Sequence, residues 1–273
     1  EDPHERTVLA SCRTFFSSIG STVVSAFALT LVDKFGNGNQ ALGFRIVMMI
    51  FGVIGCLVFF FCFFNTKERV NTYSEKVSLK ANISCLLHNT PWKLFALNIV
   101  WFFGGYVIRA GAVIYYFTYV VGNESLVQVV ATITTLVPII ANLCAPFLVK
   151  LTSKRNLMTI GNIVHSLGLL LIFFGGTNVP VLLTAAVIAA AGYGLKISMH
   201  FAMQPDPVDY GEWKSGVNTA GTLSAVNGFI GKLGMAIASS LGAALLAFGG
   251  FDADLAVQTA TAQNYIAAMY IWV

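Results

Sequence analysis

Charged residues are scarce in this chain of 273 residues, and their scarcity defines its class. Only 10% of the residues are Asp, Glu, Lys or Arg, whereas 56% are apolar, and the mean hydropathy is +0.75. A soluble domain carries about 25% charged residues, so the composition excludes that class and predicts an integral membrane protein in a lipid bilayer. The net charge of +4 is small, and we expect no nucleic-acid partner.

The apolar segments also lack the period-two alternation of membrane strands. Uncharged runs such as 47–64, 126–149 and 182–195 are apolar on every face and interspersed with Gly or Ala. With their flanks they approach the roughly 20 residues that a helix needs to cross a bilayer. The predicted fold is therefore all-α and polytopic.

The apolar runs predict seven spanning helices and the start of an eighth. They lie at 8–32, 44–65, 94–121, 126–149, 157–176, 180–204, 219–249 and from 264 onward. We predict that 1–65 holds the last two helices of an N-terminal bundle, that 66–93 is a central cytoplasmic loop, and that 94–273 is a C-terminal bundle with an incomplete last helix. Because the chain begins without Met and stops inside an apolar run, we expect a fragment truncated at both ends.

Lys and Arg are concentrated in every second loop between the predicted spans. The basic residues of these loops are Lys67, Arg69, Lys76, Lys80, Lys93, Lys150, Lys154, Arg155 and Lys214, whereas the intervening loops offer Lys34, with Arg45 at a helix edge. The excess of basic residues in short cytoplasmic loops of membrane proteins places these loops inside the cell.

Metal-ligand spacings and membrane-buried carboxylates are both missing. The five cysteines have no CxxC spacing, and no His shares a helix face with a second ligand, so we predict no metal site in this fragment. Every Asp and Glu falls in a loop or near a helix end. A coupling cation such as Na⁺ or H⁺ would find no carboxylate here, and we expect its site upstream and no cofactor.

Four basic residues, Arg13, Arg109, Lys196 and Lys232, fall inside predicted spans. Burying such a charge costs at least about 2.5–3.5 kcal/mol, so each one needs a partner or a wet cavity. Lys232 lies 13 residues into its span, about 20 Å deep, and we expect it in a substrate cavity rather than in a structural ion pair. Arg13 shares a polar face with Ser17, which suggests cavity lining, with snorkelling to the headgroups as the alternative.

Arg109 lies about as deep in its own span and is a weaker candidate for substrate binding. Tyr106 and three further tyrosines share its helix, and we interpret them as a belt at the outer membrane interface. Lys196 and His200 lie one helical turn apart, near enough to the inner surface to be hydrated. We expect a structural or gating role for them, with cavity lining as the alternative.

Small residues recur at four-residue spacing in the span that carries Lys232. Gly234, Ala238 and Gly242 form this stripe, whereas Lys232 projects from a different face. Such a stripe predicts close packing against another helix.

One charged segment, 206–216, separates two of the longest apolar runs. It reads Asp-Pro-Val-Asp-Tyr-Gly-Glu-Trp-Lys-Ser-Gly, and its charged members are Asp206, Asp209, Glu212 and Lys214. Pro205 and Pro207 predict the end of the preceding helix, and we expect a turn-forming cytoplasmic loop.

The stretch Asp-Tyr-Gly-Glu-Trp-Lys-Ser-Gly, followed about 20 residues later by Lys232, resembles the glycoside-pentoside-hexuronide:cation symporters, the melibiose permease family of the major facilitator superfamily. Other segments are similar to that family over essentially the whole chain. Glu5-Arg6 with Arg13-Thr-Phe-Phe resembles the entry into its fifth helix, 115–122 its seventh helix, and 228–234 its eleventh.

The resemblance implies helices five to eleven and the start of helix twelve of a major facilitator-type bundle in a bacterial-type inner membrane. It implies sugar contacts from Arg13 and Lys232, and more weakly from Asn227, with the cation-site aspartates on helices two and four. The implied activity is symport of a glycoside, pentoside or hexuronide with Na⁺ or H⁺ by alternating access. The signature residues at the cytoplasmic gate would be Asp206, Asp209, Tyr210, Gly211, Glu212 and Lys214.

Two other classes stay open. A major facilitator exporter of drugs or lipids would share the fold without needing Arg13 or Lys232. A membrane-embedded enzyme would need a converging acid-base pair, and His200 and Asp206, six residues apart on different faces, are the only nearby pair. We therefore predict that the protein is not an enzyme; the sequence leaves the sugar and the choice between Na⁺ and H⁺ undecided.

Overall fold

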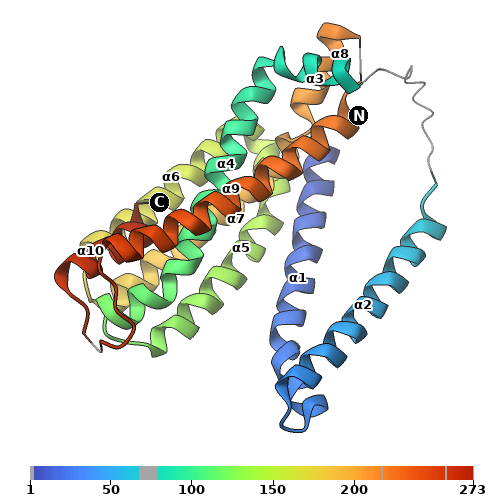
Figure 1. The fold of residues 1–273 in the computed structure, drawn as a ribbon. Helices are drawn as coiled ribbons and strands as arrows, with labels where there is room; N and C mark the ends of the chain where they lie inside the picture. Colours follow the sequence, from blue (N-terminus) through green and yellow to red (C-terminus); the bar gives the residue numbers. More distant parts are fainter. Residues whose placement is uncertain (1–2, 68–78, 217, 256, 273) are drawn as a thin grey trace. The chain divides into compact units, whose positions relative to one another are not determined.

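A computed structural model describes residues 3–67, 79–216, 218–255 and 257–272 (Figure 1). All regular secondary structure within these ranges is helical. Six of the described helices are long and apolar enough to cross a membrane. The prediction of an all-α, polytopic membrane protein is confirmed.

Every predicted span falls on a helix. The elements are α1 (Pro3–Gly36), α2 (Gln40–Asn65), α3 (Leu79–Leu87), α4 (Thr90–Tyr115), the π-helical turn η1 (Tyr116–Val120), α5 (Ser125–Leu151), α6 (Lys154–Gly175), α7 (Val179–Met203), α8 (Asp206–Ser215), α9 (Ala220–Phe248) and α10 (Ala260–Ile271). Two of them, α3 and α8, were expected as loop.

The segment 206–216 is a helix, so the prediction of a turn-forming loop is wrong. Pro207 lies in the first turn of α8, where the missing N–H of proline costs no intrahelical hydrogen bond. Gly216 ends α8 with a positive φ of 70°, and its N–H donates to the carbonyl of Glu212. The two prolines therefore separate α7 from a second helix.

The predicted loop 66–93 also contains helix. Residues 68–78 lie outside the described residues, but α3 follows them and α4 begins four residues before the predicted start at 94. Asn89 caps α4, because its side-chain oxygen accepts a hydrogen bond from the N–H of Trp92 at 3.0 Å.

The chain divides into two compact units, and Phe15–Glu75 is the smaller one. It is a helical hairpin of α2 and the part of α1 from Phe15 onward, and it turns at Asn37 and Gly38, both with positive φ. Gly43 lets the helices meet, because a side chain there would collide with the backbone of Val32. Large apolar side chains cover its outside; Phe59 is 79% exposed, which suits lipid contact.

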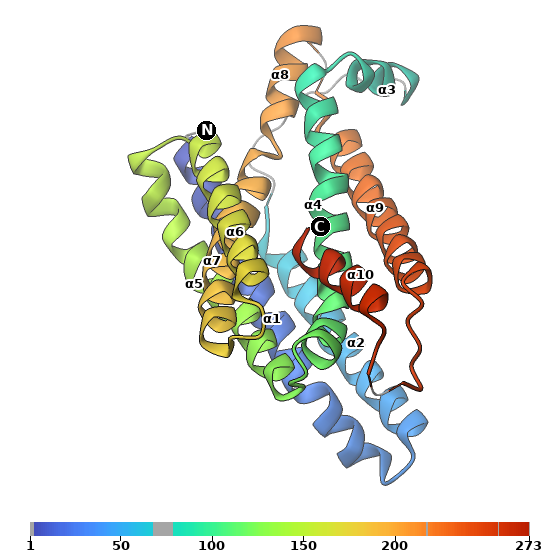
Figure 2. The same cartoon turned by 90° about the vertical axis from the view of Figure 1, so that its left-hand side faces the viewer.

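The larger unit comprises Glu1–Thr14 and Lys76–Val273. Its long helices form two groups, α5–α6–α7 and α4–α9–α10 (Figure 2). In the first group, glycines bring α6 and α7 into backbone contact, because a Cβ on Gly168 or Gly192 would collide with the facing helix.

In the second group, α9 packs on α4 through small residues. Added Cβ atoms on Gly231 and Gly234 would touch Phe103 and Val100 of α4, and Gly242 faces Met269 of α10. Gly234, Ala238 and Gly242 are all buried. The predicted packing role of this stripe is confirmed.

Candidate functional site

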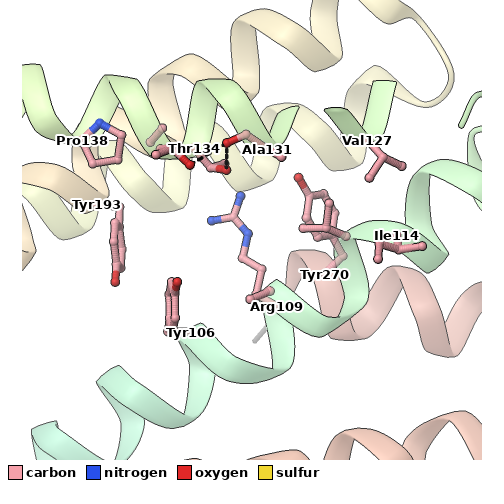
Figure 3. A pocket seen from close by; sticks show the side chains of 13 residues that line it. Tyr106, Arg109, Ile114, Val127, Ala131, Thr134, Pro138, Tyr193 and Tyr270 are labelled. Atoms are coloured by element: carbon pink, nitrogen blue, oxygen red, sulfur yellow. Dashed lines mark hydrogen bonds between the residues drawn. The ribbon is translucent and has the colours of Figure 1, made fainter. Parts of the chain in front are cut away.

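A cavity of about 360 Å³ lies where the two helix groups of the larger unit meet. It is bounded by α4, α5, α7 and α10 (Figure 3). Its polar wall consists of Tyr106, Arg109, Thr134, Thr135, Tyr193 and Tyr270. The rest of the lining is apolar, as is typical of sites that bind small molecules through a few placed polar groups.

Arg109 reaches from α4 across this cavity toward α5 (Figure 3). Its guanidinium carbon lies 5.1 Å from the ring centre of Tyr270, and its Nη1 lies 3.4 Å from Nε2 of His165. The second terminal nitrogen, Nη2, is buried and has no hydrogen-bond partner among the described residues. One end of the guanidinium is therefore held, and the other has unused donors.

His165, on α6, is fixed in the orientation that Arg109 needs. Its Nδ1 lies 2.8 Å from the carbonyl oxygen of Ala189, which can only accept, so Nδ1 carries a proton. In the neutral ring Nε2 is then an acceptor for the N–H of Arg109. Gly192 permits this arrangement, because a side chain there would collide with the backbone of His165.

Two threonines on α5 present acceptors to the same cavity. The hydroxyl of Thr135 donates to the carbonyl of Ala131 at 2.8 Å, and that of Thr134 donates to the carbonyls of Val130 and Ala131 (Figure 3). Each hydroxyl oxygen keeps lone pairs for a ligand, since its single proton is engaged by the helix.

A smaller cavity of about 50 Å³ shares Tyr106, Arg109 and Tyr193 with the first and adds Lys196 of α7. The ammonium of Lys196 lies 5.4 Å from the ring centre of Phe102 and 5.7 Å from that of Tyr193. Both are cation–π contacts. Lys196 is thus half-buried among aromatic rings and lines a cavity, which agrees with the alternative of cavity lining.

A ladder of stacked rings joins α4 to α7 beside these cavities. Tyr106 stacks on Tyr193 at 5.7 Å, Tyr193 on Phe102 at 5.9 Å, Phe102 on His200 at 4.5 Å, and His200 on Phe95 at 5.0 Å. His200 is only 2% exposed, and its Nδ1 pairs with Oδ1 of Asn98. The prediction that His200 is hydrated is wrong, because aromatic rings cover both of its faces.

The tyrosines of α4 and η1 do not form a single interfacial belt. Tyr106 lines both cavities, and Tyr116 is buried against Tyr270, with ring centres 4.6 Å apart. Depth along the helix gave no information about which face each ring occupies.

Neither of the two basic residues that the resemblance implies as sugar contacts lines this cavity. Arg13 is exposed, with its guanidinium carbon 5.2 Å from the ring centre of Phe201. Lys232 lies on an exposed face of α9 and lines neither cavity. Ser17 is exposed on the part of α1 that belongs to the smaller unit.

Asn227 serves as a contact between helices. It is 4% exposed, and its side-chain oxygen accepts a hydrogen bond from the indole N–H of Trp92 at 3.0 Å. This bond ties α9 to α4. The side-chain oxygen of Asn227 is therefore already engaged within the protein. A sugar contact from Asn227 stays a prediction.

The signature segment 206–216 packs on the capped start of α4. Asn89 donates a hydrogen bond to the carbonyl of Pro207 at 2.7 Å, and a Cβ on Gly211 would come within 2.9 Å of the Asn89 amide. Glycine in the signature thus permits a close approach. Figures 1 and 2 both show α3 and α8 at the same end of α4.

Polar contacts tie the charged residues of α8 to neighbouring segments. Asp206 forms an ion pair with Lys154 at 3.1 Å, which links α8 to the start of α6. Lys214 lies 3.4 Å from the carbonyl of His88 and over the ring of Tyr210, and Glu212 accepts a hydrogen bond from Asn218 at 3.0 Å.

His165, Tyr193 and Tyr270 were not predicted as site residues. One signal was available for His165, since a deep arginine such as Arg109 needs polar partners from other spans, and His165 is the only ionisable side chain between 157 and 176. Tyr193 and Tyr270 carried no comparable signal. Among the described residues, no group of three or more His, Cys, Asp or Glu side chains is placed to hold a metal ion.

Comparison with known proteins decides the family. The family model described as MFS/sugar transport protein matches residues 1–273. The chain belongs to this family. The match confirms the resemblance to glycoside-pentoside-hexuronide:cation symporters, a family of transporters and not of enzymes.

Several curated relatives match nearly the whole chain. The isoprimeverose transporter of Lactiplantibacillus pentosus is 34% identical over 100% of this chain and 58% of its own length. The inner membrane symporter YicJ of Escherichia coli is 28% identical over 98% of this chain and 59% of its own length. The glucuronide carrier protein homolog of Escherichia coli is 26% identical over 93% of this chain and 56% of its own length. The chain therefore spans less than three fifths of the length of these relatives.

Proposed function

We propose that this chain forms the last two helices of the N-terminal bundle and most of the C-terminal bundle of a secondary active transporter in a bacterial inner membrane. The transporter carries a glycoside, pentoside or hexuronide together with Na⁺ or H⁺ by alternating access between two helical bundles. The observation that supports this most directly is the polar, aromatic cavity around Arg109 in a member of a sugar transport family. Its volume of about 360 Å³ falls within the range of roughly 300–1,000 Å³ for small-molecule sites.

In this proposal the sugar contacts Arg109 in the cavity. Sugar contacts from Arg13 and Lys232, which line neither cavity, rest on the family resemblance alone. The printed names of the relatives support a sugar as substrate, since they include an isoprimeverose transporter and a glucuronide carrier homolog. The coupling cation binds outside this chain, because the interiors of its spanning segments hold no carboxylate. The exporter of drugs or lipids is less well supported, since the printed names of these relatives refer to sugars.

The signature segment serves as part of the cytoplasmic gate in the same proposal. Asp206, Asp209, Tyr210, Gly211, Glu212 and Lys214 lie on α8. Ion pairs such as that of Asp206 with Lys154 are modest in strength, which suits contacts that break and re-form in each transport cycle.

Uptake by the full-length protein in proteoliposomes tests this function. Labelled neutral and acidic glycosides are offered under an inward Na⁺ gradient, under an inward H⁺ gradient, and with neither. We expect one gradient to drive accumulation of at least one sugar. If no sugar accumulates under any gradient, the proposed function is wrong.

A further inference from the structure

Arg109 and Lys196 form a pair of cations without a counter-charge in the described cavities. They lie on different helices, α4 and α7, and both line the smaller cavity. None of the residues that line the two cavities is Asp or Glu. The described contacts of these cations include one imidazole nitrogen and several aromatic rings.

A cation that is half-buried without an anion is partly desolvated at a cost, so the arrangement favours a ligand that brings negative charge. A neutral sugar would offer hydroxyls to both groups and leave both charges uncompensated. A carboxylate or sulfonate would compensate charge and accept hydrogen bonds from the planar guanidinium.

The position of Arg109 defines where such an anion would lie. His165 holds Nη1, whereas Nη2 is buried and unpaired among the described residues. Arg109 and Lys196 both line the smaller cavity, so an anion in that cavity would contact both charged groups. The hydroxyl oxygens of Thr134 and Thr135 would accept hydrogen bonds from the sugar hydroxyls on the opposite wall.

We propose that Arg109 and Lys196 bind the anionic group of an acidic sugar, so that the transported substrate is a glycoside carrying a carboxylate or a sulfonate. This inference rests on the proposed function and names its substrate class. His165 is a positioning residue, because it acts on the anion only through the guanidinium that it orients.

A matched set of ligands tests the proposal on the full-length purified protein. Methyl glucoside, methyl glucuronide and methyl 6-deoxy-6-sulfoglucoside share one sugar scaffold and differ in the group on C5. We expect the wild-type protein to bind one or both acidic glycosides at least about tenfold more tightly than the neutral one, because hydrogen bonds to charged groups are stronger than those between neutral groups. The two acidic ligands distinguish a carboxylate site from a sulfonate site.

Variants of Arg109 and Lys196 test whether these two residues cause the preference for acidic glycosides. Arg109→Gln and Lys196→Gln are each expected to weaken binding of the acidic glycoside by about 10- to 100-fold and to leave the neutral one nearly unchanged. Arg155→Gln removes an exposed charge at the start of α6 and should change neither affinity. Arg109→Lys keeps the charge and should retain part of the preference, even if the glutamine variant folds poorly.

Three results would overturn the inference. The wild-type protein binds the neutral glycoside as tightly as both acidic ones, or Arg109→Gln weakens all three ligands equally, or Arg155→Gln removes the preference as fully as Arg109→Gln does. Gradient-driven uptake of methyl glucoside without any acidic preference would defeat this inference and leave the proposed function standing. Failure to transport any sugar would defeat the proposed function itself.

Discussion

The side-chain amide of Asn89 donates a hydrogen bond to the carbonyl of Pro207, 118 residues further along the chain. The same side chain caps α4 through its oxygen, and it is only 2% exposed. One asparagine therefore joins the start of a spanning helix to the signature helix α8. A movement of α8 would either break this hydrogen bond or move the start of α4 together with α8.

Replacing Asn89 with alanine should lower the free energy of unfolding by about 2 kcal/mol, since the change removes a helix cap of about 1 kcal/mol and a buried hydrogen bond of similar size. Thermal unfolding of the full-length protein in detergent measures this loss. Asn178→Ala is the matched control, because Asn178 caps α7 at an exposed site without a described bond to α8. Equal losses from the two variants would show that the contact with Pro207 contributes nothing.

Gly192→Ala should destabilise the protein by at least about 1–3 kcal/mol, because the new methyl group collides with the backbone of His165. The variant should also weaken sugar binding, since His165 orients Arg109. Gly111→Ala is the control: no atom lies within 4 Å of its added Cβ, and alanine favours helix over glycine by roughly 0.5–1 kcal/mol. The free energy of unfolding and the sugar affinity are measured for both variants. Equal changes in Gly192→Ala and Gly111→Ala would contradict this explanation.

Asp206→Asn should slow transport and leave sugar affinity and stability nearly unchanged. The side chains of Asp206 and Lys154 are 44% and 15% exposed, so we expect the pair to contribute less than about 1 kcal/mol. The combined exchange Asp206→Lys with Lys154→Asp should restore part of the rate. An unchanged uptake rate in the Asp206→Asn variant would remove this pair from the gate.

Trp92→Phe and Asn227→Ala should each lower stability by about 1–3 kcal/mol, because each leaves one buried polar partner unpaired. If the bond between them is the main contribution of Asn227, the double variant loses little more than the worse single variant. Sugar affinity should hardly change in any of the three. A specific loss of sugar affinity in Asn227→Ala would instead support the sugar contact that the family resemblance implies.

The spanning helices were predictable because uncharged apolar runs of membrane length have few alternatives. The small-residue stripe on α9 was predictable for a similar reason, since Gly and Ala at four-residue spacing leave room for a backbone. By contrast, α8 was missed because Pro205 and Pro207 indicate a helix end as readily as the first turn of another helix.

The candidate site was only partly predictable. Arg109 was recognised by its depth, but the sequence did not show which face of α4 it occupies or that His165 and Tyr193 lie opposite. These partners come from helices that are distant in the sequence, and glycine contacts such as that of Gly192 with His165 determine their approach. The position of His200 along its helix predicted hydration. The aromatic rings that bury it come from the packing of α4 against α7, which the sequence did not show.

Protection of the cavity by substrate tests the central claim most directly. A cysteine introduced by Thr135→Cys would lie in the wall of the cavity, and Ala236→Cys would lie on an exposed face of α9 as a control. With the full-length protein, we predict that a transported sugar slows alkylation of the cysteine at position 135 by a maleimide and leaves the one at position 236 unaffected. Equal labelling of position 135 with and without a sugar that the protein transports would contradict the assignment of this cavity as the substrate site.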